Sequence, residues 1–286
     1  MSPNMLRRVS VAAVAIPAAL GLVYLGGWPL TVLLSMFGVV GAFEFYRLGE
    51  RGGLRPLLGA GFIGAAIFPI VTYCVVSGER AVDPGWIVLG AVMWFIATVS
   101  FAAMRRTPAD RPLSSVAVTV FGAFYAGALP AFLLPIRHAA TLESATAATA
   151  LVFMPLVVTW VCDSLAMSGG SAIGGPKLAP VLSPNKTWAG AISGSLGAVI
   201  LAPLYGTLVL TRVGIEIELW QLAVFGLIIS IAGQIGDLSE SLFKREAGMK
   251  DSGGFFPGHG GVLDRFDSLY WVLPSSVVLL RLFGTI

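Results

Sequence analysis

The chain has 286 residues, of which 56% are hydrophobic and only 12% are charged, and its mean hydropathy is +0.86. Because soluble domains carry about 25% charged residues, this composition excludes a soluble globular protein and predicts an integral membrane protein. The net charge of +3 gives no indication of nucleic-acid binding, and the two cysteines, both inside apolar segments, make a disulfide framework improbable.

Nine apolar segments approach or exceed the roughly 18–20 residues that a helix needs to cross a bilayer. The sequence therefore predicts an all-α integral membrane protein with about nine transmembrane helices, or eight if the short last segment does not cross. Within this one membrane domain we expect an N-terminal transmembrane bundle at residues 1–140 and a C-terminal catalytic half at residues 141–286. The expected spans are 9–26, 29–46, 57–76, 86–104, 113–136, 147–168, 188–210, 219–239 and 269–283.

The positive charges predict the orientation of these spans. If the N-terminus is cytoplasmic and the spans alternate, fourteen of the 18 lysines and arginines fall on the cytoplasmic side. Cytoplasmic loops carry the excess of Lys and Arg in membrane proteins, so we expect a cytoplasmic N-terminus. The polar loops at 169–187 and 244–267 then also face the cytoplasm, where nucleotides are found.

The N-terminal half carries few polar groups inside its spans. Gly59, Gly61 and Gly64 are typical of close helix packing. Glu44 lies near the cytoplasmic end of the second span, with Arg47 three residues further on. We interpret the two as a local ion pair at the membrane interface, and a polar lining for a site is the alternative.

Asp163 lies inside the sixth span. A carboxylate at membrane depth costs at least a few kcal/mol, so we expect it to face a polar cavity; a purely structural hydrogen-bonding role is the alternative. The loop that follows has glycines at the GxxxxG spacing, from Gly170 to Gly175, but it lacks the Lys-Ser/Thr of a Walker A loop. These glycines still permit close backbone approach to phosphates.

The segment SPNKTW at 183–188 opens the seventh span. Ser183 or Thr187 is suited to cap this helix, whose N-terminus carries a partial positive charge. Together with Lys177 and Lys186, this arrangement predicts an anion-binding site. The alternative is an ordinary loop that carries positive charge because it is cytoplasmic.

Polar residues recur at three- and four-residue steps in the eighth span, which places them along one face of an apolar helix. They are Gln234, Asp237, Glu240 with Ser241, and Lys244. Such a stripe predicts a cavity that is open to the cytoplasmic side.

A last polar cluster follows in PGHGGVLDRFDS. We expect Asp264, Asp267 and Ser268 at the start of the last helix, where the helix dipole favours carboxylates. With Asp237 they form an all-oxygen set suited to Mg²⁺. His259 is suited either to donate to a phosphate or act as an acid or base, or to hold the loop.

Four blocks between residues 241 and 267 resemble the signature of one family. They are SLFKR at 241–245, KDSG at 250–253, PGHGG at 257–261 and DRFD at 264–267, at intact spacing. The segments KLAP at 177–180, SPNKTW at 183–188 and GDLSES at 236–241 resemble further motifs of that family. On these residues the chain is identified as a member of the phosphatidate cytidylyltransferases (CDP-diacylglycerol synthases).

The resemblance implies that CTP and phosphatidic acid give CDP-diacylglycerol and pyrophosphate in the presence of Mg²⁺, with the need for a second cation left open. The family's metal centre maps by motif onto Asp237 and Asp264, and we expect Asp267 to support it as a third ligand. The expected catalytic residues are Asp237, Lys244, His259, Asp264 and Arg265, and the expected substrate-binding residues are Asp163, Ser183, Lys186, Thr187, Ser241, Arg245, Lys250 and Asp251.

The family and the short loops favour a multi-pass protein of a bacterial inner membrane, with its active site facing the cytoplasm. The lipid tails of phosphatidic acid would stay in the bilayer. Faces of small residues permit a homodimer, and no nucleic-acid partner is expected.

Two other functions compete with this interpretation. A multi-span transporter would also hold carboxylates such as Asp163 and Asp237 inside the membrane, but the polar residues crowd one half of the chain and show no inverted repeat. A related cytidylyltransferase that acts on another phosphorylated lipid, such as an ether lipid, shares the same motifs. A CDP-alcohol phosphotransferase is excluded because its pattern begins with Asp-Gly, which does not occur in this chain.

Overall fold

A computed structural model describes residues 17–78, 83–256 and 260–286, and 78% of these described residues are helical. Seven helical segments in this described part are long and apolar enough to cross a membrane. The predicted all-α membrane protein is therefore confirmed as a class, although one short β-hairpin interrupts the helices. The seven segments are Gly27–Arg51, Leu58–Val76, Pro84–Arg105, Pro112–Arg137, Ala145–Ile173, Trp188–Val213 and Leu219–Glu246.

Two of the nine expected spans have no counterpart among these seven. Of the span expected at 9–26, residues 9–16 lie outside the described residues and residues 17–25 are helical. The span expected at 269–283 corresponds to helix α12, Leu269–Leu282, whose 14 residues are fewer than the roughly 20 that cross a bilayer. The count of nine and the cytoplasmic N-terminus stay predictions.

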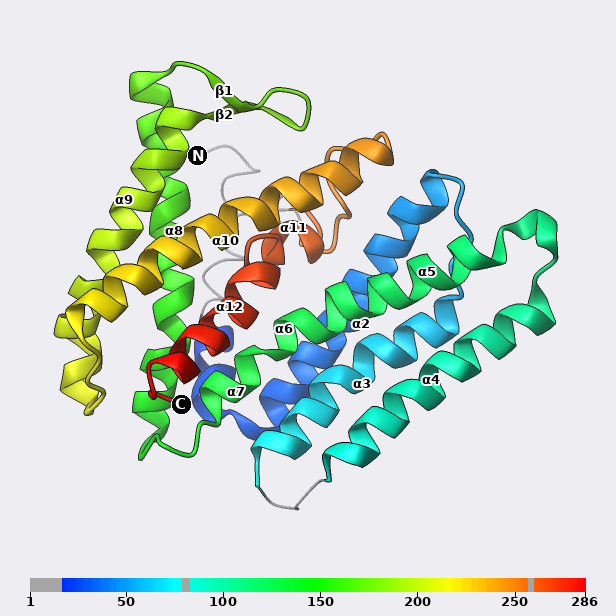
Figure 1. Cartoon of the computed structure of the whole chain (residues 1–286), viewed down its shortest axis with the longest axis horizontal. Helices are drawn as coiled ribbons and strands as arrows, with labels where there is room; N and C mark the ends of the chain where they lie inside the picture. The colour runs from blue at the N-terminus through cyan, green and yellow to red at the C-terminus, as the bar shows by residue number, and fades with distance from the viewer. Residues whose placement is uncertain (1–16, 79–82, 257–259) are drawn as a thin grey trace. The chain divides into compact units, whose positions relative to one another are not determined.

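The chain forms two compact units, Met1–Leu134 with Phe243–Arg265, and Pro135–Leu242 with Phe266–Ile286. The division into an N-terminal bundle at residues 1–140 and a catalytic half at residues 141–286 stays a prediction. The helices of the first unit (Figure 1) are α2 Gly27–Arg51, α3 Leu58–Val76, α4 Pro84–Arg105, the 3₁₀ helix η1 Pro108–Asp110, α5 Pro112–Ala123, the π-helical η2 Phe124–Ala128 and α6 Leu129–Ala131.

The first unit is packed around Tyr46, a fully buried residue of α2. Its hydroxyl donates to the carbonyl oxygen of Thr119 on α5 at 2.7 Å. Its ring fills the space beside Gly61 on α3 and Gly122 on α5, where an added Cβ atom would overlap the ring. The predicted role of Gly61 in helix packing is therefore confirmed, whereas Gly59 has open space beside it.

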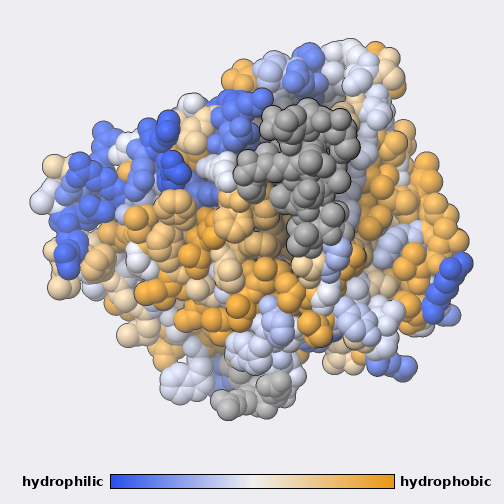
Figure 2. Space-filling model, turned by 180° about the vertical axis from the view of Figure 1, so that it is seen from behind, coloured by the Kyte–Doolittle hydropathy of each residue, from blue (hydrophilic) through white to orange (hydrophobic). Residues whose placement is uncertain are grey.

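Helix α4 has the surface expected of a helix that faces lipid. It begins after Asp83, whose side chain accepts a hydrogen bond from Gly85 N–H at 2.7 Å and so caps the helix. Its apolar side chains are largely exposed, among them Trp86 at 70% and Val88 at 63%. Exposed apolar surface of this extent is costly in water but matches the hydrocarbon of a bilayer. Hydrophobic residues also cover broad areas of the visible surface in Figure 2.

Helix α7, Leu133–Arg137, leads from the first unit into the second. The other elements are α8 Ala145–Ile173, β1 Lys177–Ala179, β2 Ser183–Thr187, α9 Trp188–Tyr205, the π-helical η3 Gly206–Leu210, the 3₁₀ helix η4 Thr211–Val213, α10 Leu219–Glu246, α11 Leu263–Phe266 and α12. Of these, α10 belongs to the second unit up to Leu242, and α11 belongs to the first unit up to Arg265.

Small residues bring α8 and α9 into close contact. An added Cβ atom on Gly190 of α9 would lie 2.5 Å from the carbonyl oxygen of Ala166 and 3.2 Å from the Cα atom of Gly170, both on α8. Gly194 of α9 is packed in the same way against Cys162. Backbone approach of this kind is how small residues hold membrane helices together, and it fixes the ends of α8 and α9 that carry the polar residues of the unit.

Candidate functional site

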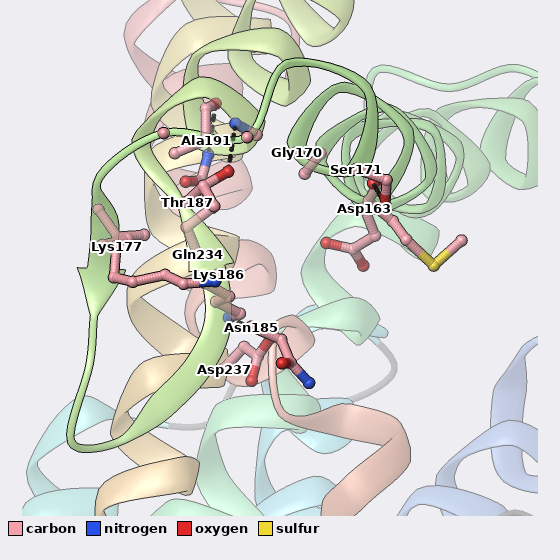
Figure 3. A pocket seen from close by; sticks show the side chains of 16 residues that line it. Asp163, Gly170, Ser171, Lys177, Asn185, Lys186, Thr187, Ala191, Gln234 and Asp237 are labelled. Carbon is pink, nitrogen blue, oxygen red and sulfur yellow. Dashed lines mark hydrogen bonds and ion pairs between the residues drawn. The ribbon is translucent and has the colours of Figure 1, made fainter.

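A polar cavity of about 770 Å³ lies in the second unit. Its walls come from the end of α8, the β1–β2 hairpin, the start of α9 and the middle of α10 (Figure 3). The charged residues that line it are Asp163, Lys177, Lys186 and Asp237, all four of which the sequence predicts as residues of a polar, anion-binding or metal site. Two carboxylates and two ammonium groups in one cavity can bind both a cation and phosphate oxygens.

Lys186 connects the hairpin to α10. Its ammonium group forms an ion pair with Oδ2 of Asp237, and Ser241 Oγ donates to Oδ1 of the same carboxylate at 3.4 Å. The carboxylate of Asp163 points into the cavity from α8 in Figure 3 and has no hydrogen bond or ion pair with any other described residue. The expected polar cavity beside Asp163 is therefore present, and the alternative of a structural hydrogen bond is not supported there.

The sequence offers Ser183 or Thr187 as the cap of α9, and the structure shows that Thr187 is the cap. Thr187 is buried, and its Oγ1 accepts a hydrogen bond from Gly190 N–H at 3.1 Å. Ser183 lies at the other end of β2, opposite Ala179 of β1, and does not line the cavity. The hairpin and the cap together place Lys186 one residue before the N-terminus of α9.

Replacing Thr187 with alanine is expected to destabilise the start of α9 by about 1 kcal/mol, because the N–H of Gly190 loses its acceptor. Thermal unfolding of the purified protein in detergent measures this loss as a lower midpoint. Thr187→Ser keeps the hydroxyl and serves as the control. Equal midpoints for the alanine and serine variants would contradict the role of this hydrogen bond.

The glycines before the hairpin have two different roles. Gly169 and Gly170 lie inside α8, and an added Cβ atom on either would crowd α9 or the loop that leads into it, so they serve packing. Gly170 also lines the cavity, and the approach of the glycines from Gly170 to Gly175 to phosphates stays a prediction. Gly174 and Gly175 follow the helix at φ of 70° and 93°, with open space beside them, and both line the cavity.

A second polar cluster, in the first unit, is built around Asp264. Oδ1 of Asp264 forms an ion pair with Lys244 of α10 at 2.8 Å. Oδ2 accepts hydrogen bonds from the N–H groups of Ser252 and Gly261 at 2.9 and 2.8 Å, and Ser252 Oγ lies 2.9 Å away. Burial alone would raise the pKa of Asp264, but these bonds, with that of Lys244 the strongest, lower it to about 2. The side chain is therefore a carboxylate at neutral pH.

Glu44 of α2 holds the loop that precedes Asp264. It is 3% exposed, and its carboxylate accepts hydrogen bonds from Val262 N–H at 3.1 Å on Oε1 and from Leu263 N–H at 2.9 Å on Oε2. The Ser252 hydroxyl lies 3.1 Å from Oε2. The predicted local ion pair with Arg47 is wrong, because Arg47 is exposed and lies over the ring of Phe43 instead. A glutamate inside an apolar span needs a partner, but this signal does not say which residue the partner is.

The loop that precedes Asp264 has glycine at positions where a larger side chain would collide with the carboxylate of Glu44 or Asp264. An added Cβ atom at Gly253 or Gly261 would overlap the side chain of Glu44. Gly260 has a φ of 84°, in the left-handed region that favours glycine, and an added Cβ atom there would lie 2.7 Å from Oδ2 of Asp264. The glycine-rich part of the motif thus fits the chain closely around Glu44 and Asp264.

The remaining expected residues lie around these clusters. Arg245 is exposed and donates to the carbonyl oxygen of Met249 at 3.1 Å, and Lys250, Asp251 and Arg265 are exposed as well. His259 lies outside the described residues, so its role stays a prediction.

The expected placement of Asp264, Asp267 and Ser268 on the first turn of one helix is wrong. Helix α11 ends at Phe266, and two turn residues separate it from α12. Within that turn, the carboxylate of Asp267 accepts the N–H of Ser268 at 2.6 Å.

The chemistry of Asp237 and Asp264 fits a hard cation such as Mg²⁺. Each carboxylate already holds one lysine ammonium group, and among the described residues Oδ1 of Asp264 has only Lys244 as a partner. Within the described part of the chain, no three His, Cys, Asp or Glu side chains are grouped so that they could hold a metal ion. This arrangement is compatible with Mg²⁺, which is commonly bound by one or two carboxylates together with substrate phosphates.

Comparison with known proteins covers nearly the whole chain. The model of the cytidylyltransferase family matches residues 6–283. A phosphatidate cytidylyltransferase of Brucella abortus is 36% identical over 286 residues, covering 99% of this chain and 94% of its own length. The protein of the same name from Bacillus subtilis is 30% identical over 284 residues, covering 98% and 99%. A third, from Staphylococcus haemolyticus, is 44% identical over 129 residues, which is 45% of this chain and 48% of that protein.

Proposed function

The chain belongs to the cytidylyltransferase family, and from this membership we propose that it transfers the cytidylyl group of CTP to phosphatidic acid, giving CDP-diacylglycerol and pyrophosphate. The observation that carries the proposal is the similarity, over nearly the full length, to two enzymes named phosphatidate cytidylyltransferase. A transporter loses support because the whole-length relatives reported above are named as enzymes. The bacterial relatives further support a place in the inner membrane. We propose that the polar cavity opens to the cytoplasm, in line with the distribution of Lys and Arg along the sequence.

The reaction needs little base catalysis, because the phosphate of the lipid is already an anionic nucleophile. One of its oxygens forms a bond to the α-phosphorus of CTP, and the bond from that phosphorus to the bridging oxygen breaks, so that pyrophosphate leaves. The main difficulty is to bring two anions together, and positive groups that offset this charge supply most of the catalysis. We assign this role to Lys186 and Lys244, with Arg245, Lys250 and Arg265 as further phosphate contacts.

We propose that Asp237 and Asp264 bind Mg²⁺, with Asp267 in support. When bound, the ion would offset phosphate charge and stabilise the leaving pyrophosphate. The lysine partners of the two aspartates suit this role, because each ammonium group can exchange its carboxylate for a phosphate oxygen when a cation binds. Asp163, with no ion pair of its own among the described residues, adds negative charge to the cavity beside Asp237.

The proposal predicts CTP-dependent labelling of lipid by the purified protein. In detergent micelles with phosphatidic acid, labelled CTP and Mg²⁺, label is expected to enter the lipid phase while pyrophosphate is released in equal amount. A chelator is expected to stop both. A well-folded protein that labels none of several phosphorylated lipids would contradict the proposal, and labelling confined to an ether lipid would move it to a related cytidylyltransferase.

A further inference from the structure

A second cavity of the second unit, about 450 Å³ in volume, lies beside the polar one. It is an apolar groove between α9 and α10, and we call it the α9–α10 groove. Leu178, Ala191 and Gln234 line both cavities, so the two are neighbours that share part of one wall. The side chains that line only the groove are Trp188, Ile192, Ser195, Leu196, Val199, Leu227, Ile231, Ile235 and Leu238.

The groove exists because α9 and α10 touch at one end and separate toward the other (Figure 1). They touch where Gly226 meets Ala198, since an added Cβ atom on Gly226 would overlap the backbone of α9. Further along, polar side chains bridge a wider gap. Ser230 Oγ donates to Ser195 Oγ at 3.0 Å, and Gln234 Nε2 donates to the same oxygen at 3.1 Å. These bridges leave open the space between the apolar side chains.

The length of the groove is close to the thickness of the hydrocarbon layer of one lipid leaflet. It runs from Trp188 to Val199 along α9 and from Leu238 back to Leu227 along α10, a rise of eleven residues in each case. At about 1.5 Å per residue this is about 16 Å, close to half of the roughly 30 Å hydrocarbon core of a bilayer. Trp188, which is 54% exposed, marks its polar end, and tryptophan is enriched at the depth of lipid headgroups.

We propose that the α9–α10 groove binds an acyl chain of the lipid substrate, whose phosphate reaches the polar cavity beside Lys186 and Asp237. This proposal rests on the proposed function and assigns its lipid subsite. A lipid seated in this way crosses the shared wall at Ala191 and Gln234 with its glycerol, where the lining changes from apolar to charged. The groove would then select phosphatidic acid by its chain, while the polar cavity binds CTP independently of that chain.

Two pairs of substitutions test the proposal, each with a control on the same helix. Ile192→Trp and Ile231→Trp fill the groove, whereas Ile200→Trp and Ile228→Trp place the same side chain at exposed positions that do not line it. For long-chain phosphatidic acid we expect each groove variant to raise the KM about tenfold relative to its control, because an overfilled site excludes the chain. The KM for CTP and the rate with a dihexanoyl lipid are expected to stay unchanged.

Binding can also be measured without turnover. Phosphatidic acid with a photoreactive diazirine in its acyl chain is expected to label the peptides that contain residues 188–199 and 227–238, and phosphatidylcholine with the same chain is expected to label them much less. Equal labelling by both lipids, or equal KM values for groove variants and controls, would overturn the groove proposal. A different result would contradict the proposed function itself, namely that the wild-type protein transfers label from CTP to no phosphorylated lipid.

Discussion

Replacing Asp264 with asparagine is expected to lower the rate of CDP-diacylglycerol formation by a factor on the order of 10²–10³, the size seen when one group that stabilises transition-state charge is removed. Asparagine removes the negative charge that holds Lys244. Its amide oxygen can still accept from the N–H groups of Ser252 and Gly261, but the amide NH2 group then faces the Lys244 ammonium group, and both are donors. The variant thus loses the proposed metal ligand and the ion pair with Lys244.

The measurement is the rate of lipid labelling across a series of Mg²⁺ concentrations, beside the thermal unfolding midpoint of each variant. Glu246→Gln is the control, because Glu246 is an exposed carboxylate of the same unit. A folded Asp264→Asn protein should need more Mg²⁺ for half of its maximal rate. If the rate and the Mg²⁺ concentration at half-maximal rate were the same as in the wild type, the assignment of Asp264 as a metal ligand would be contradicted.

Acid should weaken the same cluster. Since the pKa of Asp264 is lowered to about 2, below the roughly 3.9 of an unfolded aspartate, its ionised form stabilises the folded state above that range. This contribution is lost as the pH falls from about 4 to about 2.

The sequence predicts well those features that depend on neighbouring residues. Seven spans follow from runs of apolar residues, and the cap at Thr187 follows from its position before a helix. The stripe on α10 follows from helical spacing, and its members Asp237 and Lys244 each have a lysine or aspartate partner in the structure. The sequence predicts that the sixth span ends at residue 168, before a Gly-Gly pair, whereas α8 continues to Ile173. Glycine is frequent in membrane helices, so this pair does not end the helix.

Pairings between distant residues could not be read from periodicity. Lys186 and Asp237 are 51 residues apart, and their ion pair depends on the turn of the hairpin and the packing of α8 on α9. Glu44 lies 208 residues from Ser252. Nothing local distinguishes its role from an ion pair with Arg47, because both arguments start from the same carboxylate near a membrane surface.

Glu44 therefore gives the second large expected effect. Both of its carboxylate oxygens accept backbone N–H groups, from Val262 and Leu263. Glutamine can satisfy only one of them, because its amide nitrogen is itself a donor. Glu44→Gln is expected to lower kcat roughly 10- to 100-fold, the range typical of residues that orient a metal ligand, with a much smaller change in the KM for phosphatidic acid. Glu50→Gln, at an exposed position on the same helix, should leave both constants unchanged.

Hydrogen exchange separates a positioning role from a general loss of stability. If Glu44 fixes the loop, exchange in Glu44→Gln should speed up at residues 252–265 and stay unchanged in α3 and α5, which pack around Tyr46. Ser252→Ala should share the loss of kcat in weaker form, since it removes the hydroxyl near both carboxylates but keeps the N–H bond to Asp264. Faster exchange throughout the first unit would instead make Glu44 a group that stabilises the whole unit. A loss of activity together with faster exchange that is confined to residues 252–265 would link a buried carboxylate of the N-terminal half to the chemistry of a motif near the C-terminus.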